Sequence, residues 1–504
     1  MLNSTQNIES AIIIGGGLGG LFSGAILAKN GIKVTIIEKN SSIGGGLQSF
    51  VRFGEKFDTG MHIVGGMQEG GNIRKLCDYL GIYASDMFSK VDKNCAEEIY
   101  VASDSMTYRI ESGKEGFLNS LSRYFPHQTA NLRRYVDSMY AMVDKLPLYN
   151  LRSVRDDAVE YGEDFFLSAD CFIEKYISDI KLQGVISHLA LLYAGESRTT
   201  PAYIHAIISV LYLSGSFRFV GGTHRFADLL ASSITENGGT IIVNDAVKFI
   251  HNKGRTIYAV ETCKGRNISG DYYISDIHPA VLLGMFDDVT AFPKAYRERL
   301  SKAENSYSAF IINLKFHKDT FRYINHTGYY LKDYTSAWKM GEKNPSWPLG
   351  FLYMTPPEKM QGKYSTKMSV VVPMSWKYVQ EWEDTTLSHR TKEYQYWKNQ
   401  CLDIVLDKLN EIFPGIKNCI ESVNTASPLT IRDYYGSAEG AMCGYKRDCK
   451  NVFLSQMATK TKIDNLLLTG QNVSLHGFCG VPLTAIRTCE DILGANSIID
   501  RLKG

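Results

Sequence analysis

The segment AIIIGGGLGGLFSGAILAKNGIKVTIIEK, residues 11–39, decides the fold of this chain of 504 residues. A short apolar run leads into glycines at the spacing G-x-G-x-x-G, and a second apolar run follows. We expect a strand over residues 11–14, a helix over about 18–29 and a strand over 33–37 that ends at Glu38, 18 residues after Gly20. This order of strand, glycine turn, helix, strand and acid predicts a Rossmann-type dinucleotide-binding unit.

Each part of this segment has a physical role in holding a dinucleotide. The first glycine allows a tight turn, the second lets the backbone approach a pyrophosphate, and the third lets the helix pack close to the sheet. The free N–H groups at the start of the helix attract anions, and the acid accepts hydrogen bonds from a ribose hydroxyl. The residues predicted to contact the dinucleotide here are Gly15, Gly17, Leu18, Gly19, Gly20, Glu38 and Lys39.

Two further segments favour FAD over NAD. Directly after the first unit, SSIGGG at 41–46 predicts a second glycine turn. Residues 465–494, NLLLTGQNVSLHGFCGVPLTAIRTCEDILG, predict a short strand, a glycine turn and a helix. A ligand held by both ends of the chain is elongated and stays bound, which suits FAD better than NAD. Taken alone, the late segment is better explained as a strand, loop and helix that close the sheet.

Composition excludes several classes of function. A net charge of +2, from 55 basic and 53 acidic residues, gives no argument for a nucleic-acid partner. The ten cysteines form no CxxC pair and no zinc spacing, so we expect a reducing compartment and no metal site. The apolar run at 11–28 lacks the basic region of a signal peptide, and no other run approaches a transmembrane helix. We therefore expect a cytoplasmic protein, with peripheral contact to a membrane surface as an addition.

The absence of repeats and linkers in the sequence predicts interleaved domains. We expect an FAD-binding domain built from residues 1–100, 216–285 and 446–504. The substrate domain then has a helical part at 101–215 and an antiparallel-sheet part at 286–445.

Within these boundaries, residues 71–215 look largely helical, and 392–413 predict one long helix. The segments SAFIINLKF, LGFLYMTP and KMSVVVPMSW predict strands. Residues 203–212 are unusually apolar and predict a core helix; a membrane-facing substrate entrance is the alternative.

Taken together, these segments resemble the flavin-dependent phytoene desaturases, and within them the carotenoid isomerases and retinol saturases. The resemblance implies an α/β architecture. A Rossmann-type FAD-binding domain, similar to those of glutathione reductase and the amine oxidases, is interleaved with a mixed antiparallel-sheet and helical substrate domain. The matching stretches, beyond the first segment, are FGEKFDTGMHIVGG at 53–66, FVGGTHRFADLLASSITENGG at 219–239, YYISDIHP at 272–279, SPLTIRDYYGSAEGAMCGY at 427–445 and LLLTGQNVSLHGFCGV at 466–481.

The resemblance also implies roles for residues in the first half of the cofactor site. The glycine turn would hold the FAD pyrophosphate, Glu38 the adenosine ribose, and the backbone of Val247 the edge of the adenine. Gly45 and Gly46 would approach the cofactor from the second glycine turn. Many relatives carry a basic residue after the double glycine, whereas Gly46, Leu47 and Gln48 follow here, which leaves a phosphate contact from this loop without its usual side chain.

The late segment supplies the other half of the implied site. Gly470 and Gln471 would lie at the pyrophosphate and ribityl chain. The N–H groups of Gly480 and Val481 would face the pyrimidine ring of the flavin, where a helix N-terminus stabilises the anionic reduced form.

The sequence offers few candidates for acid–base chemistry. His62 would lie near the flavin and could donate a hydrogen bond or relay a proton, as could His476; for both, a buried structural histidine is the alternative. Tyr435 could line the cavity or transfer a proton. Cys479 adjoins the flavin turn, and packing explains it better than a covalent link.

Three functions are compatible with these sequence features. The leading hypothesis is an FAD-dependent oxidoreductase that saturates, desaturates or isomerises C=C bonds of an apolar polyene or isoprenoid substrate. The second is an amine-oxidase-type or porphyrinogen-oxidase-type flavoenzyme, and the third a prenyl or lipid carrier without flavin. The chain shows no second dinucleotide fingerprint, so electrons would come from an external donor or a docked nicotinamide, or the reaction would be redox-neutral.

Overall fold

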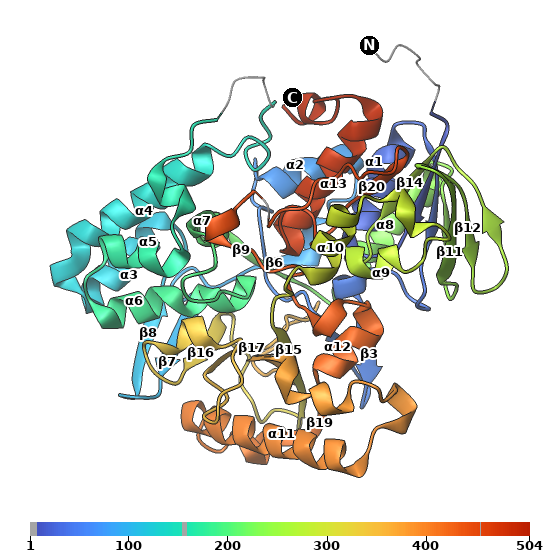
Figure 1. Ribbon diagram of the computed structural model, residues 1–504. Helices are drawn as coiled ribbons and strands as arrows, with labels where there is room; N and C mark the ends of the chain where they lie inside the picture. Colours follow the sequence, from blue (N-terminus) through green and yellow to red (C-terminus); the bar gives the residue numbers. More distant parts are fainter. Residues whose placement is uncertain (1–7, 154–158, 454, 504) are drawn as a thin grey trace.

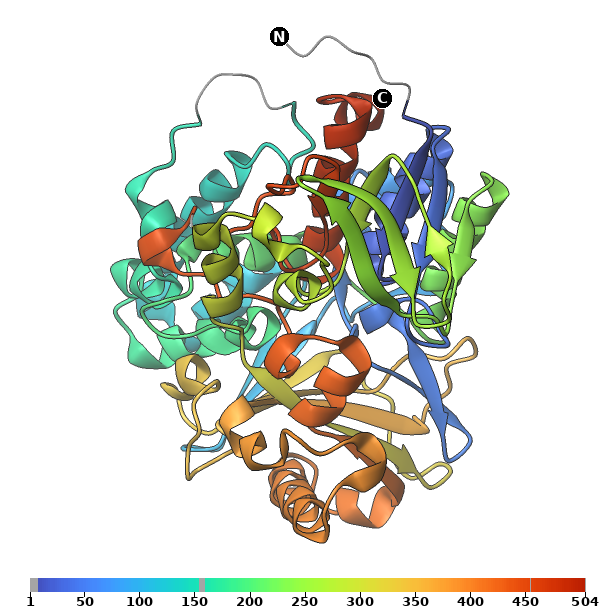
Figure 2. The same ribbon diagram turned by 45° about the vertical axis from the view of Figure 1, so that its right-hand side comes forward.

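A computed structural model describes residues 8–153, 159–453 and 455–503 of the chain. Three parts meet around its centre, as Figure 1 shows. A parallel sheet with helices lies at the upper right of that view, a group of helices at the left, and a second sheet with a long helix beneath it at the bottom. Figure 2 shows the same arrangement, with the first and last described segments in the upper part.

The parallel sheet contains the segment that predicted the fold. Its five strands lie in the order β10, β2, β1, β14 and β20, so the first and last parts of the chain share one sheet. All neighbouring pairs are parallel, and the central strands are apolar and buried, as expected where both faces of a sheet are covered. The bounds are Thr240–Ile242 for β10, Lys33–Ile37 for β2, Ser10–Ile14 for β1, Tyr272–Ser275 for β14 and Leu466–Leu468 for β20.

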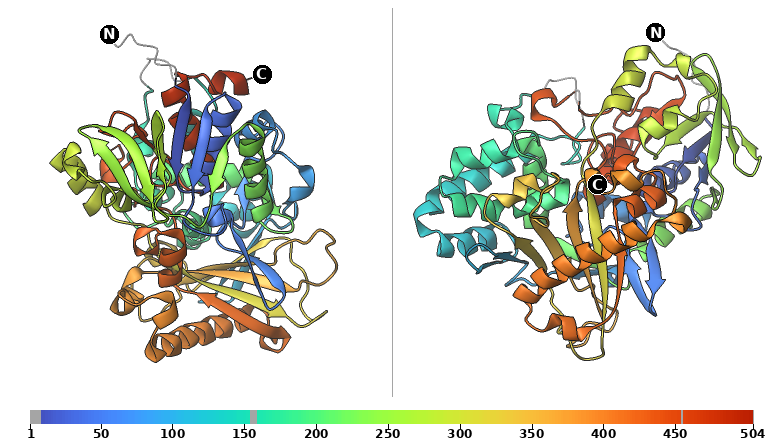
Figure 3. Two further views of the ribbon diagram at one scale, coloured as in Figure 1. Left: turned by 90° about the vertical axis from the view of Figure 1, so that its right-hand side faces the viewer. Right: turned by 60° about the horizontal axis from the view of Figure 1, so that its bottom comes forward.

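Different structures cover the two faces of this sheet. Helices α1 (Leu18–Lys29), α8 (His224–Glu236) and α13 (Gly477–Leu493) pack on one face. The antiparallel strands β11 (Val247–Lys253) and β12 (Thr256–Thr262) pack on the other, and the left view of Figure 3 shows the parallel strands between these two layers.

The second sheet forms the lower part of the molecule. Its order is β19, β15, β18, β17, β16, β7 and β8, and every neighbouring pair is antiparallel except β16 with β7. The long helix α11 (Lys392–Ile412) covers one face; it begins at the side-chain cap of Thr391 and ends just before Pro414. The strand bounds are Ile420–Ala426 for β19, Ser308–Phe316 for β15, Lys367–Met374 for β18, Gly350–Met354 for β17, Thr327–Leu331 for β16, Glu97–Val101 for β7 and Met106–Ile110 for β8.

The helical part packs on the opposite face of this second sheet from α11. Helix α7 (Ala202–Ser214) runs through its centre and is buried from Ala202 to Leu211. The interpretation of the apolar stretch as a core helix is therefore confirmed. No helix in the described ranges is long and apolar enough to cross a membrane. The other helices here are α3 (Lys114–Tyr124), α4 (Thr129–Asp144), α5 (Ala169–Tyr176) and α6 (Ile180–Ile186).

The prediction of a largely helical segment at 71–215 did not include the strands within it. Residues 71–215 are largely helical, but β6 (Phe88–Lys90), β7 and β8 lie within them as strands. Strand β7 pairs with β16, more than 200 residues later in the chain. Because its partner is so distant, the local sequence pattern did not predict β7 as a strand.

Short elements complete the described chain. They connect the three parts and shape the walls between them. Their bounds are Ser49–Arg52 for β3, Glu55–Asp58 for β4, Val64–Gly65 for β5, Asn72–Leu80 for α2, Ser216–Phe219 for β9, Asn267–Ile268 for β13, Pro279–Leu283 for α9, Lys294–Lys302 for α10 and Pro428–Tyr435 for α12.

Glycine lets α1 pack directly against its sheet. A Cβ at Gly24 would lie 2.9 Å from Cδ1 of Ile36, and a Cβ at Gly20 would collide with the carbonyl oxygen of Gly15. The neighbour of Gly20 is backbone and cannot rotate away.

We therefore expect Gly20→Ala to lower the free energy of unfolding by at least about 2 kcal/mol, because the added methyl forces α1 away from the turn. Thermal unfolding followed by circular dichroism measures this loss. Gly162→Ala is the matched control, since a Cβ at Gly162 meets nothing within 4 Å. Equal melting temperatures for the two variants would contradict this account of Gly20.

Candidate functional site

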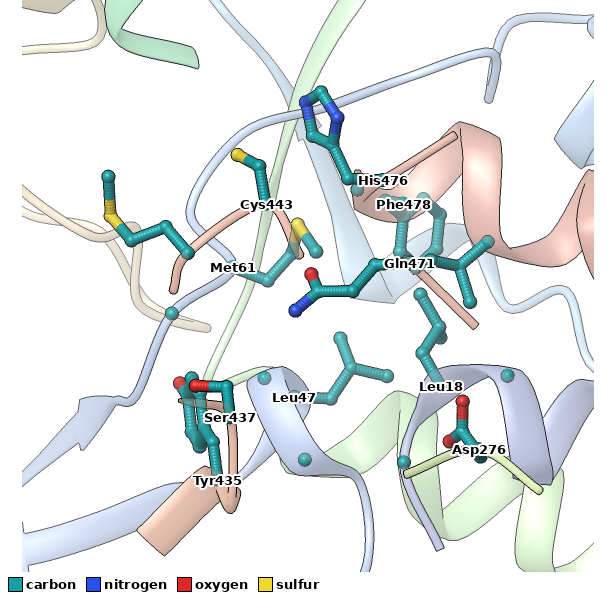
Figure 4. Close-up of a pocket in the computed structure, with 18 of the residues that line it drawn as sticks. Leu18, Leu47, Met61, Asp276, Tyr435, Ser437, Cys443, Gln471, His476 and Phe478 are labelled. Carbon is teal, nitrogen blue, oxygen red and sulfur yellow. The ribbon is translucent and has the colours of Figure 1, made fainter. Parts of the chain in front are cut away.

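One cavity of about 410 Å³ connects the three parts of the molecule. It begins at the carboxyl edge of the parallel sheet, where β1, β2 and β14 end, and continues between α7 and the second sheet. Figure 4 shows the middle of this cavity, with Asp276 and Leu18 at one end and Cys443 and His476 at another. A position beyond the carboxyl ends of parallel strands is where open α/β sheets bind ligands.

The first glycine turn forms one wall of the cavity. Gly15 has a φ of +101°, which favours glycine. Glu38 is buried and fixes the turn: one carboxylate oxygen accepts the N–H of Gly16 at 2.8 Å and the other accepts the N–H of Asn40 at 2.8 Å. The acid at the end of β2 is thus held rigidly beside the turn, with its side chain along the cavity wall.

The second glycine turn packs on the first. The N–H of Gly44 donates to the carbonyl of Gly16 at 2.7 Å, and a Cβ on Gly45 would lie 3.2 Å from the Cα of Gly17. Gly45 and Gly46 both line the cavity. This loop presents backbone and no cation to the cavity, as the sequence indicated.

Side chains from other segments complete the glycine-turn end of the cavity. Lys39 lies on the wall, and its ammonium donates to the carbonyl of Asp433 at 3.1 Å. Burial lowers the pKa of Lys39, while the charges of Glu38 and Asp433 act in the opposite direction. Val247 lines the cavity at the start of β11.

The late glycine turn joins the wall from the other end of the chain. Gln471 and Val481 line the cavity, and Figure 4 shows the Gln471 side chain pointing into it. Gly470 has a φ of +86°, and its backbone packs against Gly19. Gly480 lies in the first turn of α13 against Leu475.

The structure therefore places the predicted cofactor residues in two groups. Those that line the cavity are Gly15, Gly17, Leu18, Gly19, Glu38, Lys39, Gly45, Gly46, Val247, Gln471 and Val481. Those that lie behind its wall are Gly20, Gly470 and Gly480. The second group allows backbone segments to approach one another, which is a packing role.

The far end of the cavity is apolar. Among the described residues, the charged side chains that line the cavity are Glu38, Lys39 and Asp276, and all three lie at the glycine-turn end. Aliphatic and sulfur-containing side chains from α7, the preceding turn, the second sheet and the 442–443 loop line the far end. They are Leu191, Leu192, Ile208, Leu211, Leu352, Met354, Val371, Met442 and Cys443.

Both predicted histidines lie in the cavity wall as neutral groups. Burial lowers the pKa of His62; nearby Asp58 raises it and nearby Arg218 lowers it. The Nε2 atom of His62 has no hydrogen-bond partner among the described residues. His476 donates from Nε2 to the carbonyl of Leu192 at 3.2 Å, and burial lowers its pKa to about 4.

Two other side chains singled out in the sequence keep their protons. Tyr435 ends α12 and lines the cavity; burial raises its pKa to about 12. Burial also raises the pKa of the Cys479 thiol to about 12, and its sulfur contacts the side chain of Asn72. A thiol in this state is a poor nucleophile, which agrees with a packing role.

Sequence reasoning missed three polar groups of the cavity. Ser437 Oγ and Asn472 Oδ1 are buried there without a hydrogen-bond partner among the described residues. Asp276 lies directly after β14, and an acid after a short buried strand is a signal that could have found it. Ser437 and Asn472 lie in irregular loops, where no motif marks them.

These features fit a bound FAD. Glycine turns and a helix N-terminus suit a pyrophosphate, and the unpartnered polar atoms of His62, Ser437 and Asn472 are available to a polar ligand. The fold and cavity thus define a flavoprotein oxidoreductase. Residues 18–493 match the family model of the flavin-containing amine oxidoreductases, and the chain belongs to this family.

Comparison with individual proteins gives the same result. The chain is 25% identical over 528 residues to all-trans-retinol 13,14-reductase of Danio rerio, covering 96% of this chain and 85% of that protein. It is 22% identical over 508 residues to prolycopene isomerase 2, chloroplastic, of an Oncidium hybrid cultivar, covering 96% and 84%. A crystal structure of an oxidoreductase from Methanosarcina mazei shares the fold with a TM-score of 0.64 at 17% identity, covering 95% of this chain and 100% of that one.

These findings confirm several expectations drawn from the sequence. The resemblance, the α/β fold class with its Rossmann-type FAD-binding unit, and the enzyme class are confirmed. The protein is an FAD-dependent oxidoreductase, and FAD is its cofactor. A carrier without flavin does not agree with this family.

We expect Glu38→Ala to weaken FAD binding about 10- to 100-fold, because the carboxylate fixes the turn and, as we predict, would accept hydrogen bonds from the ribose. Fluorescence titration of the FAD-free protein with FAD measures the dissociation constant. Glu236→Ala, at the exposed end of α8, is the control and should bind FAD as the parent does. Unchanged affinity in Glu38→Ala would contradict the placement of the ribose at Glu38.

Proposed function

We propose that this flavoenzyme acts on C=C bonds of an uncharged, apolar polyene or isoprenoid, by saturation, desaturation or cis–trans isomerisation. One observation carries the proposal: among the described residues, the cavity beyond the glycine-turn end is lined by apolar and neutral side chains only. A charged group placed there would lose its hydration without gaining a partner. A long apolar chain has no charge hydration to lose, and burying its surface there is favourable.

The relatives support the same substrate class. The relative from Danio rerio is named a retinol reductase and the relative from Oncidium a prolycopene isomerase. Both names describe changes at C=C bonds of polyenes. Both similarities extend over almost the whole chain, so they include the apolar end of the cavity as well as the dinucleotide end.

The chain's own residues would bind FAD and the substrate and would exclude water from them. The two glycine turns, Glu38 and the first turn of α13 would hold FAD. The bound FAD supplies hydride transfer to or from a substrate carbon, which no side chain can perform. The aliphatic wall from α7 and the second sheet would then orient the substrate and keep water away from it.

The three candidate catalytic side chains have defined protonation states in this environment. His476 is neutral, carries its proton on Nε2, and so offers only a lone pair at Nδ1. His62 is neutral as well, and Tyr435 keeps its proton at neutral pH. We infer that these groups act as neutral hydrogen-bond partners, of which Tyr435 and His62 have a proton that no described residue accepts.

An amine substrate is the alternative, and the cavity supports it less well. A protonated amine needs a carboxylate or an aromatic cage at the reacting end. The carboxylates on the cavity wall, Glu38 and Asp276, lie beside the first glycine turn, where FAD would cover them. The external electron donor and the contact with a membrane surface remain predictions.

An absorption spectrum followed by polyene titration tests the proposal. We expect an oxidised-flavin spectrum, reduction by dithionite without oxygen, and a spectral change on adding all-trans-retinol or a carotenoid. Substrate conversion only after reduction indicates saturation or isomerisation, and flavin reduction by the polyene indicates desaturation. If no polyene perturbs or reduces the flavin, the proposed substrate class is wrong.

We expect retinoic acid to bind at least about tenfold more weakly than retinol at neutral pH, because its carboxylate would be buried without a cation. Titration of the flavin spectrum with each compound gives the two dissociation constants, and retinal is the uncharged control. Equal affinity for the acid would show that its carboxylate finds a positive partner, which would contradict the apolar end as the binding site.

We expect Val371→Phe to lower kcat/KM for the polyene about tenfold or more, because the ring fills space that the substrate needs. Val371 lies on β18, is partly buried and lines the cavity. The flavin content should stay unchanged. Val51→Phe is the control, because Val51 is 57% exposed on β3. Loss of flavin without a change in kcat/KM per flavin would contradict the assigned position of the substrate.

A further inference from the structure

Asp276 lies where the chain leaves β14, at the carboxyl edge of the parallel sheet. Its N–H donates to the carbonyl of Ile14 at 2.9 Å, so it stands next to the end of β1 and the glycine turn. Its side chain lines the cavity, and Figure 4 shows it beside Leu18. The carboxylate therefore occupies the part of the site that faces the start of α1.

Three glycines make room for this carboxylate. A Cβ on Gly17 would lie 2.6 Å from Oδ2 of Asp276, and a Cβ on Gly19 or Gly470 would collide with Oδ1. The N–H groups of Gly17 and Gly20 lie close enough to the carboxylate to lower its pKa. Asp276 thus brings a carboxylate from a distant strand to the N-terminus of α1, where Gly17, at the cap position itself, has no side chain.

The electrostatics of this position favour a protonated carboxyl. Burial raises the pKa of Asp276 to about 7, and the negative charge of Glu38 acts in the same direction. The two N–H donors lower the pKa without offsetting burial. All of these causes lie within the chain, and the negative charges of a nearby pyrophosphate would act in the same direction as Glu38.

The same N–H groups are the ones that a pyrophosphate needs. A helix N-terminus attracts one anion, and two anions side by side in a buried site repel each other strongly. Protonation of Asp276 removes one of the two charges. A neutral carboxyl keeps its place among the three glycines and gains a hydrogen to donate.

We propose that the Asp276 carboxyl takes up a proton when FAD binds, and that FAD affinity therefore falls as the pH rises above neutrality. This inference rests on FAD binding at the first glycine turn and does not depend on the identity of the substrate. It assigns a role to a side chain that no dinucleotide fingerprint includes.

Among the other titratable groups around Asp276, burial lowers the pKa of Lys39, whose deprotonation would also weaken anion binding as the pH rises, and the Asp276→Asn variant separates the two groups. From β2, Glu38 accepts two backbone N–H groups and Lys39 follows it; α1 and the β20 turn present no titratable side chain here among the described residues. His278, two residues further on, accepts the N–H of Ala280 at Nδ1 and donates from Nε2 to Asn305. Burial lowers the pKa of His278, so it stays neutral in the relevant range.

FAD affinity falls with rising pH because the Asp276 carboxyl loses its proton at a lower pH in the FAD-free protein than in the FAD complex. Below about pH 7 the carboxyl holds its proton with and without FAD, so affinity is constant. Above this pH the protein without FAD loses the proton and the complex retains it. Each further pH unit then weakens binding by up to tenfold, until the carboxyl titrates in the complex as well.

The test is the FAD dissociation constant of the FAD-free protein between about pH 6 and about pH 9, together with the proton uptake measured by calorimetry in two buffers of different ionisation enthalpy. We expect affinity to fall by about 10- to 100-fold across this range, with uptake of up to about one proton above pH 7. Constant affinity with no proton uptake in the parent protein would overturn the proposal, whatever its variants do.

Asp276→Asn is the matched variant, since it keeps the shape and removes the charge. We expect its FAD affinity to be independent of pH and tighter than that of the parent at about pH 9. Glu236→Ala is the control and should retain the parent's pH dependence. A pH dependence that persists in Asp276→Asn would overturn the proposal. Polyene turnover plays no part in these measurements, so failure of the proposed substrate class would leave their result intact.

Discussion

The close approach of backbone segments at the carboxyl edge of the parallel sheet is the constraint on which the rest of the structure depends. The start of α1 packs on β1 through Gly20, and the turn after β20 packs on α1 through Gly19 and Gly470. Side chains at these positions would collide with backbone or with the carboxylate of Asp276. Gly19 and Gly470, 451 positions apart in the sequence, are thereby held side by side.

This arrangement gives the cavity two chemically different ends. The glycine-turn end collects N–H groups and the three charged side chains of the wall, because strands and helix α1 all terminate there. The other end is built from α7 and the inner face of the second sheet, which are parts of a hydrophobic core. A cofactor with a charged pyrophosphate and a planar ring system suits the first end, and an apolar chain suits the second.

Particular residues show how far the sequence could predict the site. The glycine turn and Glu38 lie where the fingerprint indicates, because their geometry is set by neighbours within 30 residues. Gly20, Gly470 and Gly480 were predicted as cofactor contacts, and the structure places them behind the wall, where they serve packing. Asp276 was missed, because an acid after a short buried strand marks only a candidate, and the strand order is what puts it beside β1.

The sequence by itself determined the Rossmann-type unit, because a strand, a glycine turn and a helix form within one short segment whose chemistry is local. It also determined the family and the cofactor, through further motifs that lie along the whole chain. The sequence also favoured a core helix at α7, whose residues are mostly apolar, and the structure confirmed this over a membrane-facing entrance. Only the tertiary structure decided the pairing of β7 with β16, the apolar end of the cavity and the place of Asp276. These features arise from contacts between residues far apart in the chain, and such contacts leave no periodicity or spacing in the sequence.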